Sequence, residues 1–239
     1  MTSFLLELVA LLGAVGLFGW ARRLEGMNLL SLVIPVQLAA TLLLTLVVLR
    51  VVVVEPFEGV GPSMLPTFSE HSKVLVDKSA YGWRLPGGWW VWRRSTPTPG
   101  QVVVLEGKNA RQQEELLLKR VVAVGGDEVR IEGEHIFVNG VALEAMPEPV
   151  SGNEPAPLVT WSAQVLGHPH RVLLKAGVHG PATEVVTWKI NPGYVFVVGD
   201  NRAASYDSRD FGPVAQNKVL GQVVGAWRNG KLTAVDGAP

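Results

Sequence analysis

The chain has 239 residues, no cysteine and a formal net charge of zero, and 48% of its residues are hydrophobic. Zero net charge without a basic tract argues against nucleic acid as a partner. The absence of cysteine excludes disulfides, thiol nucleophiles and cysteine-ligated metals. The apolar surplus is concentrated in residues 1–54. We therefore expect a membrane anchor over 1–54 and an outer domain over 55–239.

Two apolar runs, residues 4–20 and 29–49, predict membrane-spanning helices. A spanning helix needs roughly 20 apolar residues, with a range of about 17–25. The second run has no charged residue over its 21 positions, and the first carries only Glu7. The alternative is one span, with the first segment lying along the membrane surface.

Arg22 and Arg23 determine the orientation that we expect for this anchor. A cleaved signal peptide has basic residues before its apolar core, whereas this pair follows the first run. Because basic loops stay in the cytoplasm, we expect residues 21–28 to form a cytoplasmic loop. The chain after Arg50 then lies on the outer face of the cytoplasmic membrane, as part of a multi-pass protein.

Residues 55–239 predict a mainly β domain. Short runs rich in Val, Ile and aromatic residues alternate with Gly, Pro, Asn and Asp, a pattern typical of strands separated by turns. We expect a coiled multi-sheet structure or a partly open β-barrel. The expected strands are 73–77, 101–106, 116–124, 128–131, 135–138, 184–190, 194–198 and 219–227.

Two segments interrupt this pattern. Residues 145–183 are rich in Pro, Gly and Ala and predict a smaller inserted β or irregular subdomain that extends to about residue 190. Residues 82–94 hold four of the eight tryptophans, together with three arginines. Tryptophan beside arginine is typical of a membrane interface. The alternative is that these tryptophans pack on the sheets of the domain itself.

A bent segment, Gly61–Phe68, carries the candidate nucleophile Ser63. Gly61, Pro62 and Pro66 prevent a helix or a regular strand from running through this segment. A serine between glycine and proline is more often an ordinary turn residue. A catalytic role therefore requires a base and an orienting group elsewhere in the chain.

Lys119 is the candidate base. Strand alternation over residues 116–124 places it on one face with Leu117 and Val121. Among these side chains the amine is desolvated, which lowers its pKa from about 10.4. A neutral amine accepts a proton from a nearby serine hydroxyl. The alternative is a strand-edge lysine whose amine reaches water.

A polar loop over residues 198–214 supplies the third group of candidates. It contains four Asp or Asn residues, two Arg and two Ser directly after an apolar strand. Ser205 is a candidate to orient the Lys119 amine, and Asp207 with Arg209 a candidate ion pair that holds the loop. The alternative is an ordinary solvated surface loop.

The five histidines do not supply a Ser-His-Asp arrangement: His71 lies in a polar loop, His135 in a strand, and His168, His170 and His179 in the insertion. His168 and His170 are too isolated to bind a metal without further ligands. We expect neither a metal nor another cofactor.

The serine turn, the lysine strand and the polar loop together resemble the type I signal peptidases, membrane-bound Ser–Lys endopeptidases that remove signal sequences from exported proteins. The resemblance covers about residues 50–140 and 190–225, in the order of the family's motifs. The matching residues are Glu55-Pro56-Phe57, Ser63-Met64-x-Pro66-Thr67, Lys119-Arg120-Val121-Val122, Gly125-Gly126-Asp127, Gly199-Asp200-Asn201-Arg202, Ser205, Asp207-Ser208-Arg209 and Gly212.

The resemblance implies a role for these residues. Ser63 is the nucleophile, Lys119 the general base and Ser205 the group that orients the lysine. The backbone N–H of Ser63 and the region of Gly61 form the oxyanion hole, although some members have a serine at the position of Gly61. The implied substrate pocket is Phe57, Val60, Met64, Leu65 and Leu117, and the implied structural residues are Arg120, Asp200, Asn201, Arg202, Asp207 and Arg209.

The resemblance also implies the reaction and its partners. Secretory precursors are cleaved after small residues of an Ala-x-Ala signal, at the outer face of the cytoplasmic membrane, beside membrane lipid and without a cofactor. Two alternatives stay open. One is a non-catalytic, membrane-tethered β protein used for binding or assembly, and the other is a specialised Ser–Lys processing peptidase of the same fold.

Overall fold

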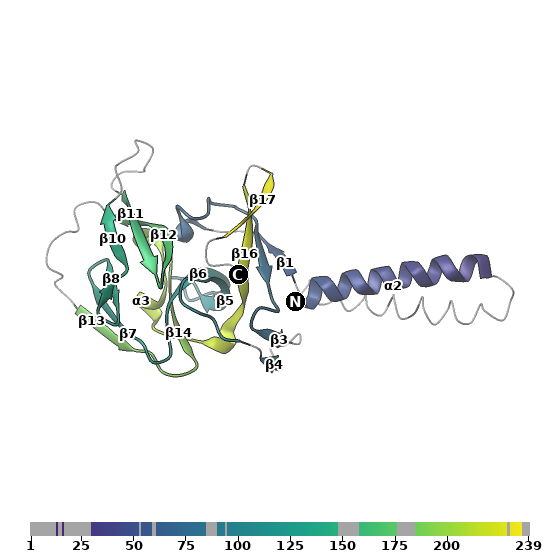
Figure 1. The fold of residues 1–239 in the computed structure, drawn as a ribbon, viewed down its shortest axis with the longest axis horizontal. Helices are drawn as coiled ribbons and strands as arrows, with labels where there is room; N and C mark the ends of the chain where they lie inside the picture. Colours follow the sequence, from purple (N-terminus) through teal and green to yellow (C-terminus); the bar gives the residue numbers. More distant parts are fainter. Residues whose placement is uncertain are drawn as a thin grey trace. The chain divides into compact units, whose positions relative to one another are not determined.

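The computed structural model describes residues 13, 16, 30–52, 54–58, 61–84, 90–93, 95–147, 158–175, 185–228 and 230–235 (Figure 1). The chain divides into two compact units. The first comprises Met1–Glu55 with Gly82–Arg93, and the second comprises Pro56–Tyr81 with Arg94–Pro239. The division of the sequence into an anchor over 1–54 and a catalytic domain over 55–239 stays a prediction.

The first unit contains helix α2, Leu30–Val52. The hydroxyls of Thr41 and Thr45 each donate to the carbonyl four residues earlier, at 2.8 Å. Such bonds satisfy a polar side chain within its own helix. The unit also contains the antiparallel pair β3, Gly82–Arg84, and β4, Trp90–Arg93.

Neither predicted membrane span is confirmed. In the part of the chain that the structure describes, no helix combines the length and the apolar character needed to cross a membrane. Apart from Gly13 and Gly16, the predicted span 4–20 and the predicted loop 21–28 lie outside the described residues.

The tryptophan-rich segment is described in part. The Trp92 side chain is 57% exposed. The side chains of the other three tryptophans of residues 82–94 lie outside the described set. Both interpretations of this segment, lipid contact and internal packing, therefore stay predictions.

The second unit is organised around a sheet of eight strands. Its order is β1-β2-β16-β5-β6-β14-β15, and β17 pairs with β16. The bounds are β1 Val54–Phe57, β2 Val74–Asp77, β5 Val102–Lys108, β6 Glu114–Val124, β14 Tyr194–Val198, β15 Val214–Ala215, β16 Val219–Arg228 and β17 Lys231–Ala234. This architecture confirms the mainly β expectation. The described strands at the two ends of the order do not pair with each other, so the sheet stays open.

Two smaller sheets complete this unit. One has the order β13-β7-β8-β9 and the other β10-β11-β12. Their bounds are β7 Glu128–Glu132, β8 His135–Val138, β9 Val141–Ala142, β10 Glu144–Pro147, β11 Leu158–Val165, β12 His168–Lys175 and β13 Val185–Lys189. Short helical turns lie between strands: η2 Pro62–Met64, η3 Arg202–Ala204, α3 Ser208–Phe211 and η4 Gln216–Lys218. Each of the eight strands expected from sequence coincides with one of the observed strands.

The segment expected to be an insertion, 145–183, contains a regular hairpin. Strands β11 and β12 pair over their full length, from Leu158 with Lys175 to Val165 with His168. Leu166 and Gly167 connect them, both with positive φ, of 45° and 84°. That is the backbone of the two-residue hairpin turns, which Asn-Gly or Asp-Gly usually form. Because leucine replaces the usual first residue, the sequence carried no turn signal here.

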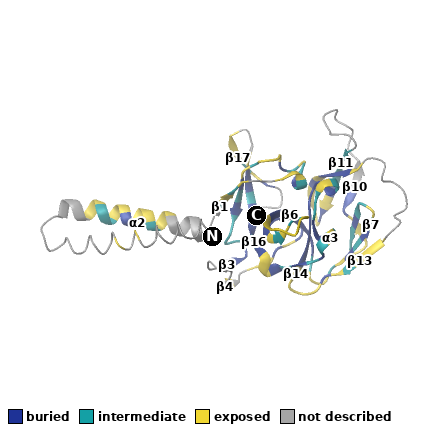
Figure 2. Ribbon diagram, turned by 180° about the vertical axis from the view of Figure 1, so that it is seen from behind, coloured by how far each residue is buried: buried dark blue, intermediate teal, exposed yellow. Residues whose placement is uncertain are grey.

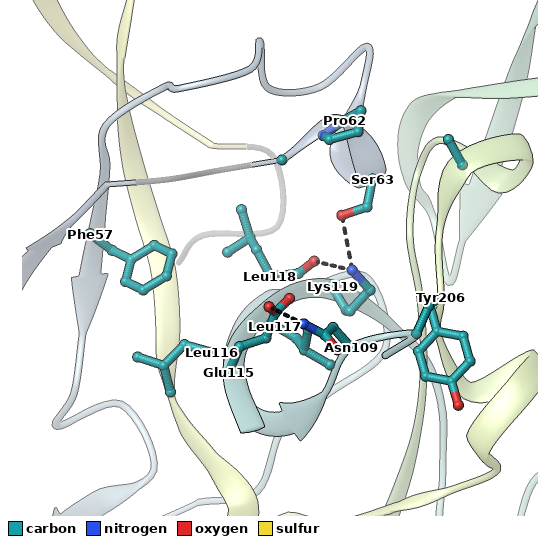
Figure 3. A pocket seen from close by; sticks show the side chains of 13 residues that line it. Phe57, Pro62, Ser63, Asn109, Glu115, Leu116, Leu117, Leu118, Lys119 and Tyr206 are labelled. Carbon is teal, nitrogen blue, oxygen red and sulfur yellow. Dashed lines mark hydrogen bonds between the residues drawn. The ribbon is translucent and has the colours of Figure 1, made fainter. Parts of the chain in front are cut away.

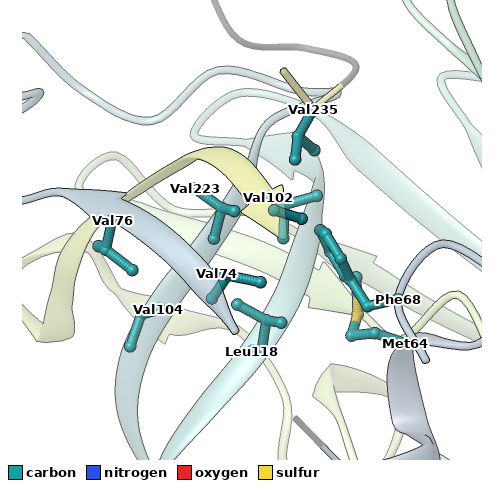
Figure 4. Packing of buried hydrophobic residues seen from close by; sticks show 10 residues of the cluster. Met64, Phe68, Val74, Val76, Val102, Val104, Leu118, Val223 and Val235 are labelled. Carbon is teal, nitrogen blue, oxygen red and sulfur yellow. The ribbon is translucent and has the colours of Figure 1, made fainter. Parts of the chain in front are cut away.

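Strand β6 lies at the centre of the main sheet. It pairs with β5 along its first seven residues and with β14 along its last five. Its residues from Leu117 to Ala123 are all buried, on both faces of the sheet (Figure 2). One face packs through Leu118 against Met64, Phe68 and Val102 (Figure 4). A side chain in this stretch of β6 is therefore removed from water whichever way it points.

Candidate active site

The serine turn is held by the core on one side and by the polar loop on the other. Ser63 lies in η2, and the neighbouring Met64 side chain is fully buried. Asn201 donates its backbone N–H to the Ser63 carbonyl at 3.0 Å. The Asn201 side-chain amide donates to the Pro62 carbonyl at 3.1 Å. Together these contacts fix where the Ser63 hydroxyl is presented.

Lys119 meets this hydroxyl from the middle of β6. A hydrogen bond of 2.9 Å joins its Nζ to the Ser63 Oγ, and Nζ also donates to the Leu118 carbonyl at 3.1 Å (Figure 3). Lys119 is only 3% exposed, so its amine does not reach water as a strand-edge lysine would. Burial lowers the pKa of Lys119 to about 8, although nearby carboxylates act in the opposite direction. Roughly one amine in ten is then neutral at pH 7.

The strongest of these opposing carboxylates, Asp207, is itself paired. Arg209 Nε donates to Asp207 Oδ1 at 2.9 Å, and Arg209 Nη2 donates to Oδ2 at 3.0 Å. The Gly199 backbone N–H donates to the same carboxylate at 2.9 Å. Burial alone would raise the pKa of Asp207, but the Arg209 guanidinium holds it below its usual range. The expected ion pair between Asp207 and Arg209 is therefore present. It reduces the effect of the Asp207 charge, which favours the ammonium form of Lys119.

A second buried pair ties β6 to the polar loop. Arg120 Nε and Nη2 donate to the two oxygens of Asp200 at 2.9 and 2.8 Å, with both side chains almost fully buried. Arg120 also donates to the Gly100 carbonyl at 2.9 Å. Thr67, four residues after Ser63, donates its hydroxyl to Asp200 at 2.5 Å. Burial alone would raise the pKa of Asp200, but the bidentate Arg120 guanidinium holds that pKa below its usual range.

The Ser63 and Lys119 side chains line a cavity of about 200 Å³. Phe57 lies at one end of it and Tyr206 at the other (Figure 3). Its lining is Phe57, Gly61, Pro62, Ser63, Asn109, Ala110, Glu115, Leu116, Leu117, Leu118, Lys119, Ala204 and Tyr206. Among the described residues, no group of three or more His, Asp or Glu is arranged to hold a metal ion.

Of the pocket residues expected from sequence, Phe57 and Leu117 line this cavity. Met64 lies in the hydrophobic core beneath the serine turn instead, and Leu65 is not part of the lining. Val60 lies outside the described residues. Gly61 lines the cavity beside the serine, and its part in an oxyanion hole stays a prediction.

Comparison with known proteins shows the family to which this chain belongs. The family model described as signal peptidase, peptidase S26, matches residues 32–227. The chain is 35% identical to a signal peptidase I of Pseudomonas aeruginosa, over 81% of this chain and 68% of that protein. The chain belongs to the signal peptidase family. It is also 32% identical to a signal peptidase I of Pseudomonas fluorescens, over 77% of this chain and 68% of that protein. Signal peptidase I V of Bacillus subtilis is 29% identical, over 68% of this chain and 79% of its own length.

One solved structure of a signal peptidase I, from Enterococcus faecalis V583, covers 54% of this chain and 99% of its own chain at 24% identity. The TM-score is 0.30, which is too low for a comparison of the two folds. The geometry of this signal peptidase is therefore described from its own residues.

Ser205 forms no hydrogen bond with the Lys119 amine in this structure. Its hydroxyl is buried and lies close enough to the Asp207 carboxylate to help lower the pKa of Asp207, although it meets no hydrogen-bond geometry there or at Lys119. It packs against Gly199, where an added Cβ would overlap the Ser205 Oγ and come within 2.5 Å of the Ser63 carbonyl oxygen. The position after β14 therefore requires glycine. The orienting role of Ser205 stays a prediction.

Glu144 is a supporting residue that sequence reasoning missed. Arg202 donates to the Gly199 carbonyl at 3.1 Å and forms a buried ion pair with Glu144, the first residue of β10. Glu144 also accepts the Ile136 backbone N–H at 3.0 Å. Burial alone would raise the pKa of Glu144, but Arg202 holds it below its usual range. The two partners lie 58 residues apart in sequence, so no local pattern marks the pair.

Replacing Glu144 by glutamine should destabilise this signal peptidase, because Arg202 keeps a buried charge without a counter-charge. We expect Glu144→Gln to lower the free energy of unfolding by about 3–5 kcal/mol. Urea unfolding of the detergent-solubilised full chain measures this change. Glu132→Gln is the matched control, since its partner Arg130 is 40% exposed and such pairs contribute about 0–1 kcal/mol. Equal effects of the two substitutions would contradict the buried pair.

Proposed function

We propose that Ser63 is the nucleophile and Lys119 the general base with which this signal peptidase cleaves the signal peptides of exported precursors. The observation that carries the proposal is the 2.9 Å contact between a buried amine and a serine hydroxyl, inside a cavity. A lysine whose pKa is lowered to about 8 is matched to proton transfer near neutral pH. A non-catalytic scaffold would have no need to keep an ammonium-forming group buried beside a serine.

The proposed reaction has two halves. In the first, the neutral Lys119 amine takes the Ser63 proton as Oγ attacks the carbonyl carbon of the scissile bond. The resulting ammonium gives that proton to the departing amine, so an acyl-serine forms and the mature chain leaves. In the second, a water gives a proton to the neutral Lys119 amine and attacks the carbonyl carbon of the ester. The bond from that carbon to Ser63 Oγ then breaks, the signal peptide leaves with a free carboxyl group, and the Lys119 ammonium returns the proton to Oγ. Backbone N–H groups at Gly61 and Ser63 are the proposed donors to the oxyanion.

The walls of the cavity are compatible with a substrate that has small apolar residues before the cut. Phe57 and Leu117 contribute apolar side chains to this space of about 200 Å³, which accommodates alanine side chains. The backbone of β6 on one side of the cavity offers N–H and C=O groups to an extended chain. We therefore propose the Ala-x-Ala type of signal as the substrate class.

The proposed location is the cytoplasmic membrane, with the catalytic domain on its outer face. The apolar runs 4–20 and 29–49 support two spans, and the arginine pair between them supports a cytoplasmic loop at 21–28. Lipid is a proposed partner of the tryptophan-rich segment as well as of the spans.

Cleavage of a purified precursor tests the two catalytic residues. We expect the detergent-solubilised chain to cut a precursor whose signal ends in Ala-x-Ala. Ser63→Ala and Lys119→Ala should each reduce kcat by at least about 10³-fold, because they remove the nucleophile and its base. Lys189→Ala, at an exposed lysine of β13, is the control and should cut normally. Cleavage that persists in Ser63→Ala would refute the proposal, and no cleavage by wild type would favour the non-catalytic alternative.

The rate should rise with pH, because the proposed base accepts a proton only in its neutral form. Because burial lowers the Lys119 pKa to about 8, kcat/KM should rise roughly tenfold per pH unit below about pH 7 and level off above about pH 9. Asp207 raises this pKa, so Asp207→Asn should move the rising limb to lower pH. A rate that falls between pH 6 and pH 8 would rule out Lys119 as the base.

Reporter fusions test the topology. An enzyme active only in the cytoplasm, fused after Gly26, should be active, and the same enzyme fused after Pro239 should be inactive. The reciprocal reporter, active only outside, should show the opposite pattern. Activity of both fusions on one side of the membrane would contradict two spans.

A further inference from the structure

The hairpin of β11 and β12 lies directly against the polar loop that holds Ser63. Strand β12 packs against η3 in this loop, and both belong to the second unit. Leu173 of β12 pairs with Thr160 of β11 on one side. On its other side Leu173 forms an isolated parallel bridge with Asn201. The hairpin, which the sequence marks only as part of an insertion, is therefore continued by main-chain pairing into the loop beside the catalytic cavity.

A single peptide group, between Asp200 and Asn201, joins β12 to the serine turn. Its carbonyl accepts the Leu173 backbone N–H at 2.8 Å, and its N–H donates to the Ser63 carbonyl at 3.0 Å. The C=O and N–H of a trans peptide group point in opposite directions, so this group lies between the two segments as a middle strand lies in a sheet. Consecutive hydrogen bonds of this kind polarise and strengthen one another. The position of the Ser63 main chain is thereby coupled to β12.

The hairpin also contacts the side chain of Asp200. His170 Nε2 lies 4.0 Å from Asp200 Oδ1, and the His170 side chain is only 2% exposed. Burial lowers the pKa of His170 to about 4, so its ring is neutral near pH 7. A neutral ring packs beside Asp200 without competing, as a cation would, with Arg120 for the carboxylate. Strand β12 thus constrains both the main chain and the side chain of Asp200.

We propose that Leu173 is a positioning residue for signal-peptide cleavage. Its backbone N–H acts through the peptide group between Asp200 and Asn201, and it fixes the serine turn so that Ser63 Oγ stays within 2.9 Å of Lys119 Nζ. This proposal rests on the proposed function, because the position of Ser63 matters for cleavage only if Ser63 is the nucleophile. A displacement of about 1 Å in a reacting group can lower a rate about 10²-fold. Since β12 contributes no residue to the lining of the cavity, its effect falls on kcat and not on substrate binding.

Replacing one backbone N–H by oxygen tests this role. Leucic acid, the α-hydroxy counterpart of leucine, is introduced at position 173 of the full chain, so that an ester replaces the amide and the donor to Asp200 is lost. Leu174 is the matched control, because it is the same residue type and is equally buried. Its N–H faces β11, since N–H groups along a strand point alternately to its two edges. An ester at position 174 therefore weakens the hairpin without removing a bond to the polar loop.

The ester at position 173 should lower kcat for a purified precursor by about three- to tenfold, the loss expected for one hydrogen bond. KM and the pH at which the rate rises should stay unchanged, and the ester at position 174 should leave kcat unchanged. A rising limb that moves to higher pH would contradict the proposal, because Lys119 would then have become exposed to water through general loosening of the site. Equal kcat values for the two ester chains, with cleavage still abolished by Ser63→Ala, would overturn the role of Leu173 and leave the proposed function standing.

Hydrogen exchange at Asn201 tests the same link without catalysis. The Ser63→Ala chain keeps the main-chain carbonyl that accepts the Asn201 N–H. In this chain, the ester at position 173 should make the Asn201 N–H exchange faster than the ester at position 174 does, as measured by NMR in detergent. Faster exchange supports the positioning of the serine turn by Leu173 even if wild type cuts no precursor. Equal exchange in the two ester chains overturns it even if wild type cuts normally.

Discussion

The burial of one amine is the constraint on which the arrangement of this site depends. Lys119, the proposed base, can accept a proton only while it is neutral, and an ammonium is favoured wherever water or unpaired carboxylates surround it. The chain meets this condition by placing Lys119 in the stretch of β6 that is buried on both faces. It also pairs the nearby carboxylates with arginines, Asp207 with Arg209 and Asp200 with Arg120. Each arginine offsets the charge of its carboxylate. Burial is then the larger effect, and the pKa of Lys119 is lowered.

The same pairs position the nucleophile. Asp200 and Asn201 are consecutive: the first is bound by Arg120 and Thr67, and the second holds the carbonyls of Pro62 and Ser63. The polar loop therefore connects the strand of Lys119, the proposed base, with the turn of Ser63, the proposed nucleophile. A buried ion pair adds little net stability against an apolar replacement. Its contribution here is geometric, since it fixes two distant segments to within hydrogen-bond distance.

Sequence reasoning was successful where the signal is local. Alternating Val and Ile runs predicted the strands, because that pattern depends on a few adjacent residues. The same alternation placed Lys119 on one face with Leu117 and Val121, but it left open whether the amine is buried or reaches water. Sequence reasoning was less successful where a contact joins distant segments. Glu144 in β10 reaches Arg202 across 58 residues, and nothing near Glu144 in sequence indicates this. Met64 was expected in the pocket because it adjoins Ser63, but the 3₁₀ turn directs its side chain into the core. The Leu166-Gly167 hairpin was missed because leucine rarely adopts a positive φ.

A direct titration of the Lys119 amine tests the central claim most closely. Lysine labelled with ¹³C at Cε is introduced into the detergent-solubilised chain, and the resonance absent from Lys119→Ala identifies the residue. The account predicts a chemical-shift titration of this resonance with a pKa near 8, below the roughly 10.4 of a free lysine side chain. A Lys119 resonance that titrates at that free value would contradict a buried, neutral base beside Ser63.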